Sequence, residues 1–530
     1  MSRAEARAAR RAWAMWSLPA LLFLIAFSHR AAPGIIAKDL MQEFGVTGAI
    51  VGLLSATYFY AYAGFMIPSG LCIDAFGVRR VVAAGGVIMG LGTGAMALAG
   101  APRLLFAGRF AVGLGATVTF IGALKIAATW FPPTRFGFLS AVTATIGVLG
   151  ALASTAPLAA LVGLAGWRGA LGIIGAATLV ASALCLGLLR DRPEAGGFEA
   201  ARGPGLRQVF AGAFEVLRNR HTWPPFLAFF CLYAAFGNLT LWIVPYLRDV
   251  YDLSGERAAL YATAPSIALL FSAPLTGFLS DQVWKRRKLP YVALVAASAV
   301  VWAGFVATLG TLPLPGVYTL LFVLGTVGGA FVLTWPIGRE VNPPHLAGIA
   351  VAVVNFGGFV GAALTQGPIG AVLDARWAGA LSAGARVYPV EAYAAAFGAC
   401  AAFVLAAAIL SLLGAEVYTI ERHERLALAA ADRLRHLGYE NVQVRHGDGT
   451  LGWAEQAPFD AISVTAGGPD VPPSLLSQLG RGGRLVMPIG PTPRLQELVR
   501  VTRTIGGYRT EPLGQVQFVP LVGAEGHPSQ

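Results

Sequence analysis

One eleven-residue pattern occurs twice in this chain of 530 residues. The first copy reads GLCIDAFGVRR at residues 70–80, and the second reads GFLSDQVWKRR at residues 277–287. The copies start 277 − 70 = 207 residues apart, and each follows an apolar run long enough to cross a membrane. The aspartate of such a loop can pair with a basic residue or a helix N-terminus, and the arginines suit the anionic surface of a bilayer. A loop repeated at equivalent places predicts a protein made of two similar halves.

Apolar runs of about 20 residues, the length that crosses a bilayer, occur twelve times. The predicted spans are residues 13–36, 48–72, 78–100, 102–130, 137–164, 167–189, 223–247, 258–280, 289–310, 315–338, 346–372 and 390–413. The basic start before residue 13 is followed by too long an apolar run for a signal peptide, so we interpret that run as the first span. We predict an all-α membrane protein with a six-helix bundle at 13–189, a cytoplasmic linker at 190–222 and a second six-helix bundle at 223–413. Within the linker, the segment that begins at Leu206 is amphipathic and is predicted to lie on the membrane surface.

The composition supports this prediction and divides the chain in two. Apolar residues make up 56% of the chain and charged residues 12%, with a mean hydropathy of +0.65, whereas soluble chains average about 25% charged residues. Residues 1–414 hold 28 Lys/Arg and 15 Asp/Glu, and residues 415–530 hold 11 and 12. The charged fraction is therefore 43/414, about 10%, in the first part and 23/116, about 20%, in the second. These values exclude a wholly soluble protein, a disordered protein and a nucleic-acid binder.

The basic residues also indicate an orientation, because cytoplasmic loops of membrane proteins are enriched in Lys and Arg. If the N-terminus is cytoplasmic, that side receives 18 Lys/Arg and the opposite side receives 7. An even number of spans then places both termini in the cytoplasm of a multi-pass inner or plasma membrane protein. The four cysteines lie in apolar runs without a CxxC pair, so we predict core packing and no metal site.

Further motifs give the first 413 residues a family resemblance. The pattern G-x-x-x-D-x-x-G-x-R-R of residues 70–80, RFAVGLG at 109–115 and WFP at 130–132 resemble the signatures of the major facilitator superfamily. The second loop departs from that pattern at Trp284, and Ala151 stands where the family's antiporters have proline. The resemblance implies secondary active transport by two six-helix bundles around a midplane cavity that opens to each side in turn. The loop residues expected to act in this conformational switch are Gly70, Asp74, Gly77, Arg79, Arg80, Gly277, Asp281, Arg286 and Arg287.

Ionisable residues inside spans are costly and are candidates for function. Arg30, with His29 beside it, lies well inside the first span, and Arg109 and Lys125 lie in the fourth. Arg30 is a candidate for substrate or ion contact, with structural pairing as the alternative, and Arg109 is a candidate for a structural, coupling or substrate role. Lys125 is near a span end and can instead extend its amine to the membrane surface. His29 could carry a proton, which would allow proton coupling, or could be hydrogen-bonded to a neighbouring helix.

These cations lack carboxylates at the same depth, so they favour a small anionic substrate. Further polar and aromatic residues in the second half are candidates for the cavity wall, with interhelical packing as the alternative: Asn238, Trp242, Asn355 and Gln366. Transport itself requires no cofactor, and its expected partners are the bilayer and a small solute.

From Gly414 the sequence changes to an α/β pattern. Strands are predicted at 417–420, 441–445, 459–464 and 484–488, and helices at 422–437 and 473–479. Alternating strands and helices favour a parallel sheet. The tail, residues 415–530, is therefore predicted to be a partial α/β domain.

Several segments of the tail look like protein-L-isoaspartate O-methyltransferase. They include EVYTIER at 416–422, GDGTLGW at 447–453, APFD at 457–460 and GGRLVMPIG at 482–490. The resemblance implies S-adenosylmethionine as cofactor, with Glu421 on the ribose hydroxyls and Asp448 on the adenine. No catalytic residue is assigned.

The match begins at the family's second strand, because residues 406–413 complete the twelfth span. The family's first strand is therefore absent, and the end of the twelfth span stands in its place. The Gly-x-Gly-x-Gly turn that follows this strand, and that lets the backbone approach the cofactor, is absent as well. That strand is central in the sheet, so we expect a gap between its neighbours and no methyltransferase activity. The alternative function is a membrane-tethered methyltransferase, and a third is a regulatory tail. A gene fusion and a frameshifted gene model both explain the join.

Overall fold

The computed structural model describes residues 3–193, 206–284, 287–412, 417–436, 439, 442–492, 495–504 and 506–528. The chain divides into two compact units, Met1–Gly414 and Ala415–Gln530, which are described separately. In the second loop of the repeated pattern, Lys285 and Arg286 are outside the described residues.

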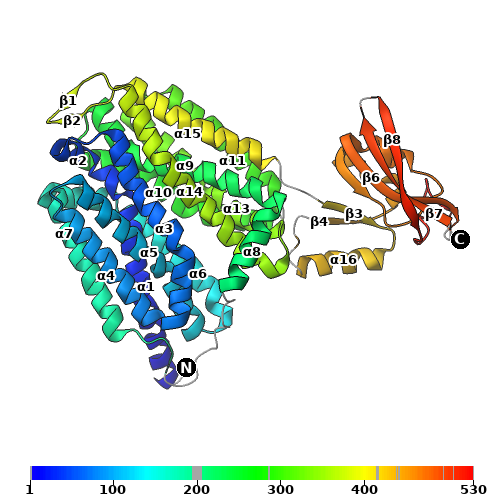
Figure 1. Ribbon diagram of the computed structural model, residues 1–530, viewed down its shortest axis with the longest axis horizontal. Helices are drawn as coiled ribbons and strands as arrows, with labels where there is room; N and C mark the ends of the chain where they lie inside the picture. The colour runs from blue at the N-terminus through cyan, green and yellow to red at the C-terminus, as the bar shows by residue number, and fades with distance from the viewer. Residues whose placement is uncertain are drawn as a thin grey trace. The chain divides into compact units, whose positions relative to one another are not determined.

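The first unit is helical and is made of two bundles (Figure 1). The first bundle contains α1 (Arg3–Ile35), α2 (Ala37–Phe44), α3 (Gly48–Phe76), α4 (Val78–Ala97), α5 (Pro102–Trp130), α6 (Phe136–Ala153) and α7 (Ala156–Leu188), with η1 (Pro133–Arg135) before α6. The linker helix α8 (Leu206–Arg218) and η2 (Arg220–Thr222) follow. The second bundle contains α9 (Trp223–Tyr251), α10 (Gly255–Phe278), the π-helical η3 (Leu279–Trp284), α11 (Lys288–Ala307), α12 (Leu314–Gly328), η4 (Gly329–Leu333), α13 (Thr334–Glu340), η5 (Pro344–Leu346), α14 (Ala347–Ala375) and α15 (Val390–Ser411). A short hairpin of β1 (Leu381–Ser382) and β2 (Ala385–Arg386) precedes α15.

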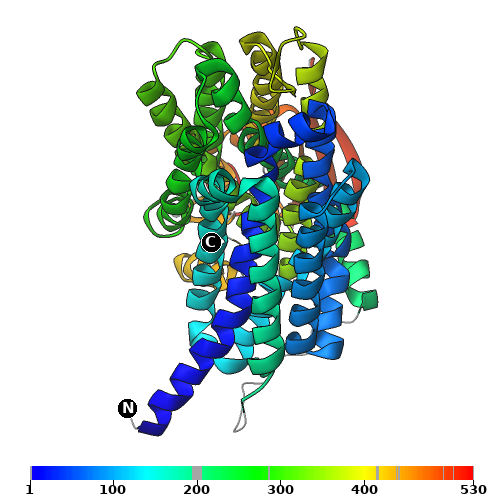
Figure 2. The same ribbon diagram turned by 90° about the vertical axis from the view of Figure 1, so that its left-hand side faces the viewer.

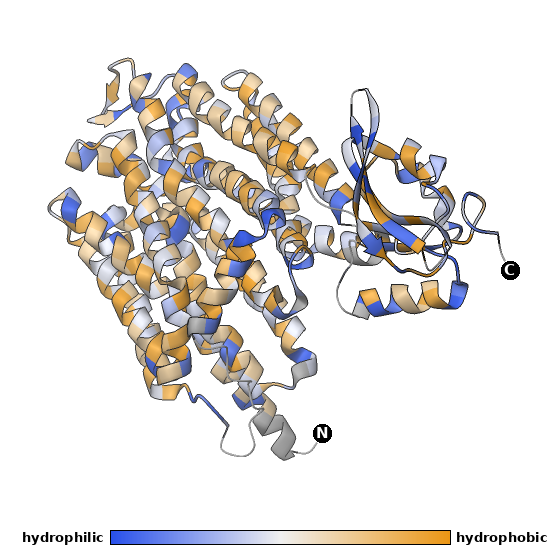
Figure 3. Cartoon of the chain, turned by 45° about the vertical axis from the view of Figure 1, so that its right-hand side comes forward, coloured by the Kyte–Doolittle hydropathy of each residue, from blue (hydrophilic) through white to orange (hydrophobic). Residues whose placement is uncertain are grey.

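Twelve segments in the described residues are long and apolar enough to cross a membrane. Their helices lie side by side, with α1 in dark blue along the length of the unit (Figure 2), and many apolar residues lie on the outer faces of the helices (Figure 3). The predicted spans are confirmed, but the fifth is interrupted at Ser154–Thr155, where α6 ends and α7 begins. The turn predicted between the fifth and sixth spans falls at Gly166, whose φ of 68° bends α7. Glycine tolerates this left-handed conformation, and α7 therefore consists of two helical segments that meet at Gly166.

The two bundles meet most closely along α3 and α14. A Cβ added to Gly48 would lie 3.0 Å from the carbonyl oxygen of Gly370, and one added to Gly52 would overlap the backbone of Gln366. Small residues therefore let the two backbones touch at the end of the interface formed by the start of α3 and the end of α14. We call this the closed end.

The linker helix α8 is amphipathic, as predicted. Val216 is buried in a small cluster with Leu346 and Ala350 of the second bundle, while Phe210 and Phe214 are exposed. Its position on a membrane surface remains a prediction.

The tail contains β3 (Val417–Glu421), α16 (Glu424–His436), β4 (Val442–His446), η6 (Gly449–Leu451), η7 (Ala454–Gln456), β5 (Phe459–Ser463), α17 (Pro473–Ser477), β6 (Leu479–Thr492), β7 (Leu495–Thr504) and β8 (Gly507–Val516). The predicted strands and helices are confirmed. The prediction of a parallel sheet holds for β3 with β4 and for β5 with β6, whereas β7 and β8 pair antiparallel. The connections between β6, β7 and β8 are too short for a parallel crossover, which requires a dozen or more residues.

The sheet of the tail is in two pieces. In the described part of the tail, β3 pairs with β4 alone, and β5, β6, β7 and β8 form a second sheet. The gap expected from the missing first strand is therefore present, between β3 and β5. The ring centre of Tyr418 on β3 lies 5.8 Å from that of Phe459 on β5, so an aromatic contact joins the two pieces. The larger sheet has a small apolar core around Leu479, Leu485 and Met487.

Candidate functional site

Arg30 lies where the two bundles meet. Its Nε donates to the Tyr58 hydroxyl of α3 at 3.4 Å, and its Nη1 donates to the Tyr233 hydroxyl of α9 at 3.1 Å. Tyr58 belongs to the first bundle and Tyr233 to the second, so one guanidinium bridges the two bundles. Among the described residues, no ion pair joins Arg30 to a carboxylate.

Aromatic rings enclose the Arg30 guanidinium. Its Cζ atom lies 3.7 Å from the ring centre of Phe27 and 5.2 Å from the ring centres of Tyr62 and Phe359. Rings at such distances attract a cation through their quadrupole, by about 0.5–2 kcal/mol each. They partly compensate the positive charge without neutralising it.

Arg109 and His29 lie next to Arg30 within the first bundle. Arg109 is 1% exposed, and its guanidinium donates to the backbone oxygens of His29, at 2.6 Å, and Arg30, at 3.3 Å. His29 is also buried, and its Nε2 lies 3.4 Å from the Thr93 hydroxyl of α4. Arg109 thus fixes the backbone of α1 at Arg30, and His29 points into the first bundle.

Lys125 lies away from Arg30, at the opposite end of α3 from the closed end. Its Nζ atom forms an ion pair of 2.8 Å with Asp74, and both side chains are substantially exposed. The structure therefore does not bring Lys125 together with Arg30.

The four candidates of the second bundle lie on α9 and α14. The Asn238 amide donates to the Thr365 hydroxyl at 2.9 Å, and the Gln366 amide lies 3.4 Å from the Gly237 oxygen. These two contacts join α9 to α14. Trp242 is fully buried against Tyr388, and Asn355 is half-buried on α14.

At the closed end, a buried ion pair joins the bundles. Lys38 of α2 lies 2.6 Å from Asp249 of α9, and the two side chains are 7% and 4% exposed. Asp249 also accepts from the backbone N–H of Tyr388 and from the hydroxyl of Tyr393. Burial lowers the pKa of the Lys38 amine, although Asp249 acts in the opposite direction.

A second carboxylate holds the first turn of α3. Asp374, at the end of α14, accepts from the backbone N–H groups of Gly48 at 2.9 Å and Ala49 at 2.7 Å. It also accepts from Arg386 at 3.0 Å and Tyr388 at 2.7 Å. A carboxylate at a helix N-terminus is stabilised by the free N–H groups and the helix dipole. Asp374 therefore binds the second bundle to the first.

The first of the two signature loops is held by the linker. Gly77 has a φ of 84°, which favours glycine. The backbone N–H of Arg79 donates to Asp191 at 2.7 Å, and the Arg79 side chain donates to the Leu186 oxygen at 2.6 Å. Arg80 is exposed, and Gly70 lies near Ile121.

The second loop has a different arrangement. It begins at Gly277 on α10, and the backbone of Asp281 lies in the π-helical η3. Arg287 forms an ion pair with Glu340 at the end of α13, and both side chains are largely buried. The Arg286 prediction lies outside the described residues.

Two elements of the site were not predicted from sequence. Tyrosines occur at positions 58, 60 and 62, a spacing of two that does not place all three on one face of a helix. The outer two are nevertheless one helical turn apart, and their rings stack with centres 5.9 Å apart beside Arg30. Tyr60 points away and is exposed. The i,i+4 spacing of the outer pair was the available signal. The Lys38–Asp249 pair spans 211 residues of sequence, and no local pattern reveals such a contact.

In the tail, the two carboxylates expected to bind the cofactor accept hydrogen bonds from the protein itself. Glu421 accepts from the backbone N–H of His423 at 2.9 Å. Asp448 accepts from the N–H and hydroxyl of Thr450 and from the N–H of Ala524. Burial acts to raise the pKa of Asp448, but these hydrogen bonds hold it below its usual value. One oxygen of Asp448 thus holds the turn at Thr450, and the other joins this turn to the segment at Ala524 near the end of the tail.

No group of three or more His, Cys, Asp or Glu that could hold a metal occurs among the residues that the structure describes.

The fold and the interbundle site define a membrane transporter of two helical bundles. The sequence model of the Major Facilitator Superfamily matches residues 20–366, and the chain belongs to that superfamily. It is similar in fold to solved structures of a bacterial homologue of the human lysosomal transporter Spinster. The inward-facing, unoccupied form is 17% identical, with 76% of this chain and 97% of that chain covered and a TM-score of 0.66. The inward-facing, occupied form is 18% identical, with 75% and 96% covered and a TM-score of 0.62.

The tail matches a second family. The model of Protein-L-isoaspartate(D-aspartate) O-methyltransferase covers residues 380–526, a range that includes the last membrane helix, α15. A protein-L-isoaspartate O-methyltransferase of Protochlamydia amoebophila is 58% identical over 121 residues, which are 23% of this chain and 58% of the relative. One of Geotalea uraniireducens is 59% identical over 122 residues, 23% of this chain and 56% of the relative. The chain thus spans a little over half the length of these relatives.

Proposed function

We propose that the chain is a secondary active transporter that moves a small organic anion by alternating access, with Arg30 as the anion-binding residue. The observation that carries this proposal is the position of Arg30 between the bundles with hydroxyl and aromatic partners. A charge held away from water needs compensation, and hydroxyls and rings supply only part of it. An anion at Arg30 would complete the compensation, and its binding would be felt by both bundles.

The closed end supports the alternating-access part of the proposal. Lys38–Asp249 and Asp374–Gly48 hold α2 and α3 against the second bundle, and both must separate for that end to open. With the termini in the cytoplasm, as the distribution of Lys and Arg favours, the closed end faces away from the cytoplasm. The structure is then an inward-facing state.

The remaining candidates have secondary roles in this proposal. Arg109 positions Arg30, and the Asn238–Thr365 and Gln366–Gly237 contacts hold the wall of the second bundle. Trp242 and Asn355 belong to the same helices, α9 and α14. His29 is the candidate proton carrier if transport is coupled to protons.

Uptake by the full chain in proteoliposomes tests the proposal. A panel of labelled organic anions, cations and neutral solutes is offered with and without a pH gradient. We expect uptake of anions that falls by more than tenfold in Arg30→Ala and is partly restored in Arg30→Lys. Arg103→Ala, which changes an exposed arginine in the first turn of α5, is the matched control and should retain uptake. Uptake of cations or neutral solutes that is unaffected by Arg30→Ala would overturn the proposal.

The tail supports a second candidate function, a membrane-tethered methyltransferase, through its 58% identity to that family. We infer that the tail does not have this activity, because its sheet is divided at β3 and β5 and Asp448 is engaged elsewhere. Titration of the full chain with S-adenosylmethionine tests this inference. Binding in the micromolar range would contradict it.

A further inference from the structure

We infer that the linker helix α8 binds the membrane surface, with an apolar stripe of Phe210, Phe214 and Leu217 in the lipid and arginines on the headgroups of anionic lipids. This surface is separate from the anion site, so the inference does not depend on Arg30. It rests on the three faces of α8, on the place where α8 meets the second bundle and on the charges beside the stripe.

One face of α8 packs on the second bundle. Val216 is buried in a cluster with Leu346 and Ala350, where α14 begins. A Cβ added to Gly212, one turn earlier, would lie only 2.6 Å from the Ile349 side chain. α8 therefore lies against the first turns of α14, at the end of that helix opposite the closed end.

A second face of α8 carries the apolar stripe. Phe210, Phe214 and Leu217 stand at positions i, i+4 and i+7, which share one side of a helix, and they are 56%, 58% and 37% exposed. Trp223 is 42% exposed near the start of the span Arg220–Tyr251, and its indole N–H donates to the Leu217 oxygen at 3.0 Å. Tryptophan is enriched where spans leave the bilayer, so the stripe is level with the membrane surface.

The third face of α8 is polar, and basic residues border the stripe. Successive helical residues are rotated by about 100°, which places Gln208, Glu215 and Arg218 together on this face, and all three are exposed. The Arg218 guanidinium carbon lies 4.5 Å from the centre of the Phe214 ring, and Arg220 is exposed two residues further on. An apolar stripe, a polar outer face and arginines between them are typical of a helix that lies in the surface of an anionic membrane. Anionic lipids are enriched in the cytoplasmic leaflet, which α8 meets in the orientation proposed for the transporter.

Hydrogen bonds after the end of α8 fix this orientation of the helix. The Asn219 amide donates to the Val341 oxygen at 2.6 Å and to the side-chain oxygen of Asn342 at 3.1 Å. The Asn342 amide in turn donates to the Thr222 hydroxyl at 2.9 Å. Rolling α8 to bury its stripe against the bundle would break these bonds and expose Val216. The stripe therefore needs a partner from outside the bundle, and the lipid around the spans is continuous with it.

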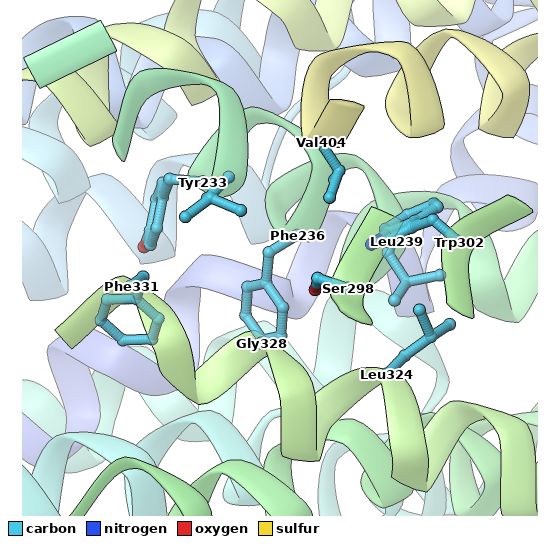
Figure 4. A pocket seen from close by; sticks show the side chains of 10 residues that line it. Tyr233, Phe236, Leu239, Ser298, Trp302, Leu324, Gly328, Phe331 and Val404 are labelled. Atoms are coloured by element: carbon cyan, nitrogen blue, oxygen red, sulfur yellow. The ribbon is translucent and has the colours of Figure 1, made fainter. Parts of the chain in front are cut away.

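The cavity inside the second bundle is too small for a lipid chain. Phe236, Trp302 and Phe331 are among its walls (Figure 4), and its volume is about 30 Å³, which is space for water. The contact of this bundle with lipid is therefore on its outer surface, where α8 lies.

A spin label on either side of α8 tests the contact with lipid. Phe214→Cys and, as the matched control, Glu215→Cys are labelled in the full chain with Cys72→Ser, because Cys72 is exposed and the other three cysteines are buried. In nanodiscs of phosphatidylcholine and phosphatidylglycerol, we expect position 214 to collide more with oxygen, which dissolves in lipid, than with a water-soluble nickel chelate. Position 215 should show the reverse. More collisions with nickel than with oxygen at position 214 would overturn the inference, and so would protection from both, which indicates a protein partner.

The role of the arginines is tested with the same label at position 214. The ratio of oxygen to nickel collisions should rise by about twofold or more when phosphatidylglycerol is added to phosphatidylcholine, because each arginine strengthens binding to an anionic surface. Arg218→Gln combined with Arg220→Gln should remove that rise. Arg257→Gln, at an exposed arginine in the first turn of α10, is the matched control and should keep it. A ratio that is independent of phosphatidylglycerol, or a rise that survives the double change, would overturn the assignment of anionic lipid.

Discussion

The bundles meet at two places where the charged side chains have different kinds of partner. At the closed end, Lys38 is paired with Asp249, and Arg386 with Asp374. In the centre, Arg30 has two hydroxyls and a set of rings. Removing a charge from water is costly in both places. The paired charges hold the two bundles together at the closed end, whereas the charge at Arg30 has no carboxylate partner among the described residues and is the one that the proposed function assigns to an anion.

The largest effect should follow from breaking the pair at the closed end. Asp249→Asn leaves Lys38 buried without a countercharge, which costs about 3–5 kcal/mol. The conformation in which the closed end is shut should lose population by more than a hundredfold relative to the open one. Labelling of a cysteine introduced at Ala37, which is fully buried beside Lys38 on α2, measures this opening.

A double replacement sharpens the same point. Lys38→Met combined with Asp249→Leu removes both charges, and apolar residues of similar volume often replace a buried pair without loss. The double variant should therefore stay shut. If Asp249→Asn is as inaccessible to the label as wild type, the pair does not hold the closed end.

Arg109 should have an intermediate effect, because it acts on Arg30 through the backbone. Arg109→Lys keeps the charge but cannot donate to the oxygens of both His29 and Arg30 as the guanidinium does. The loss of one charge-assisted hydrogen bond, about 1.5–3 kcal/mol, should weaken anion binding by about tenfold or more. The measurement is the affinity for an anion together with its KM in uptake.

The control for Arg109 is the double variant with Arg30→Ala, because independent structural damage would give losses of affinity that add. If Arg109 positions Arg30, the Arg30→Ala and Arg109→Lys changes should not add, because each removes the same interaction with the anion. Additive losses would show that Arg109 acts independently of Arg30.

The helices around this site and its two arginines could be predicted from the sequence, whereas the aromatic partners of Arg30 could not. Length, hydropathy and the repeated loop identify the spans and the family, because the bilayer imposes about 20 apolar residues on each helix. Arg30 and Arg109 stand out as charges within apolar runs. Tyr233 and Phe359 do not, because an aromatic residue in a span is ordinary until the helices are packed. The gap between β3 and β5 was predictable because the family resemblance named the strand that the chain replaces.

The smallest effect should come from a charge that is paired and accessible to water. Lys125 and Asp74 are 30% and 44% exposed, and exposed pairs contribute about 0.2–1 kcal/mol. Lys125→Gln should therefore leave anion affinity and KM within about threefold of wild type, with any change confined to the rate of the conformational step. Anion uptake by proteoliposomes, compared with Arg30→Ala in the same preparation, measures both quantities. A loss of affinity in Lys125→Gln as large as that in Arg30→Ala would mean that an exposed, paired lysine binds the anion, and the contrast between paired and unpaired charges would fail.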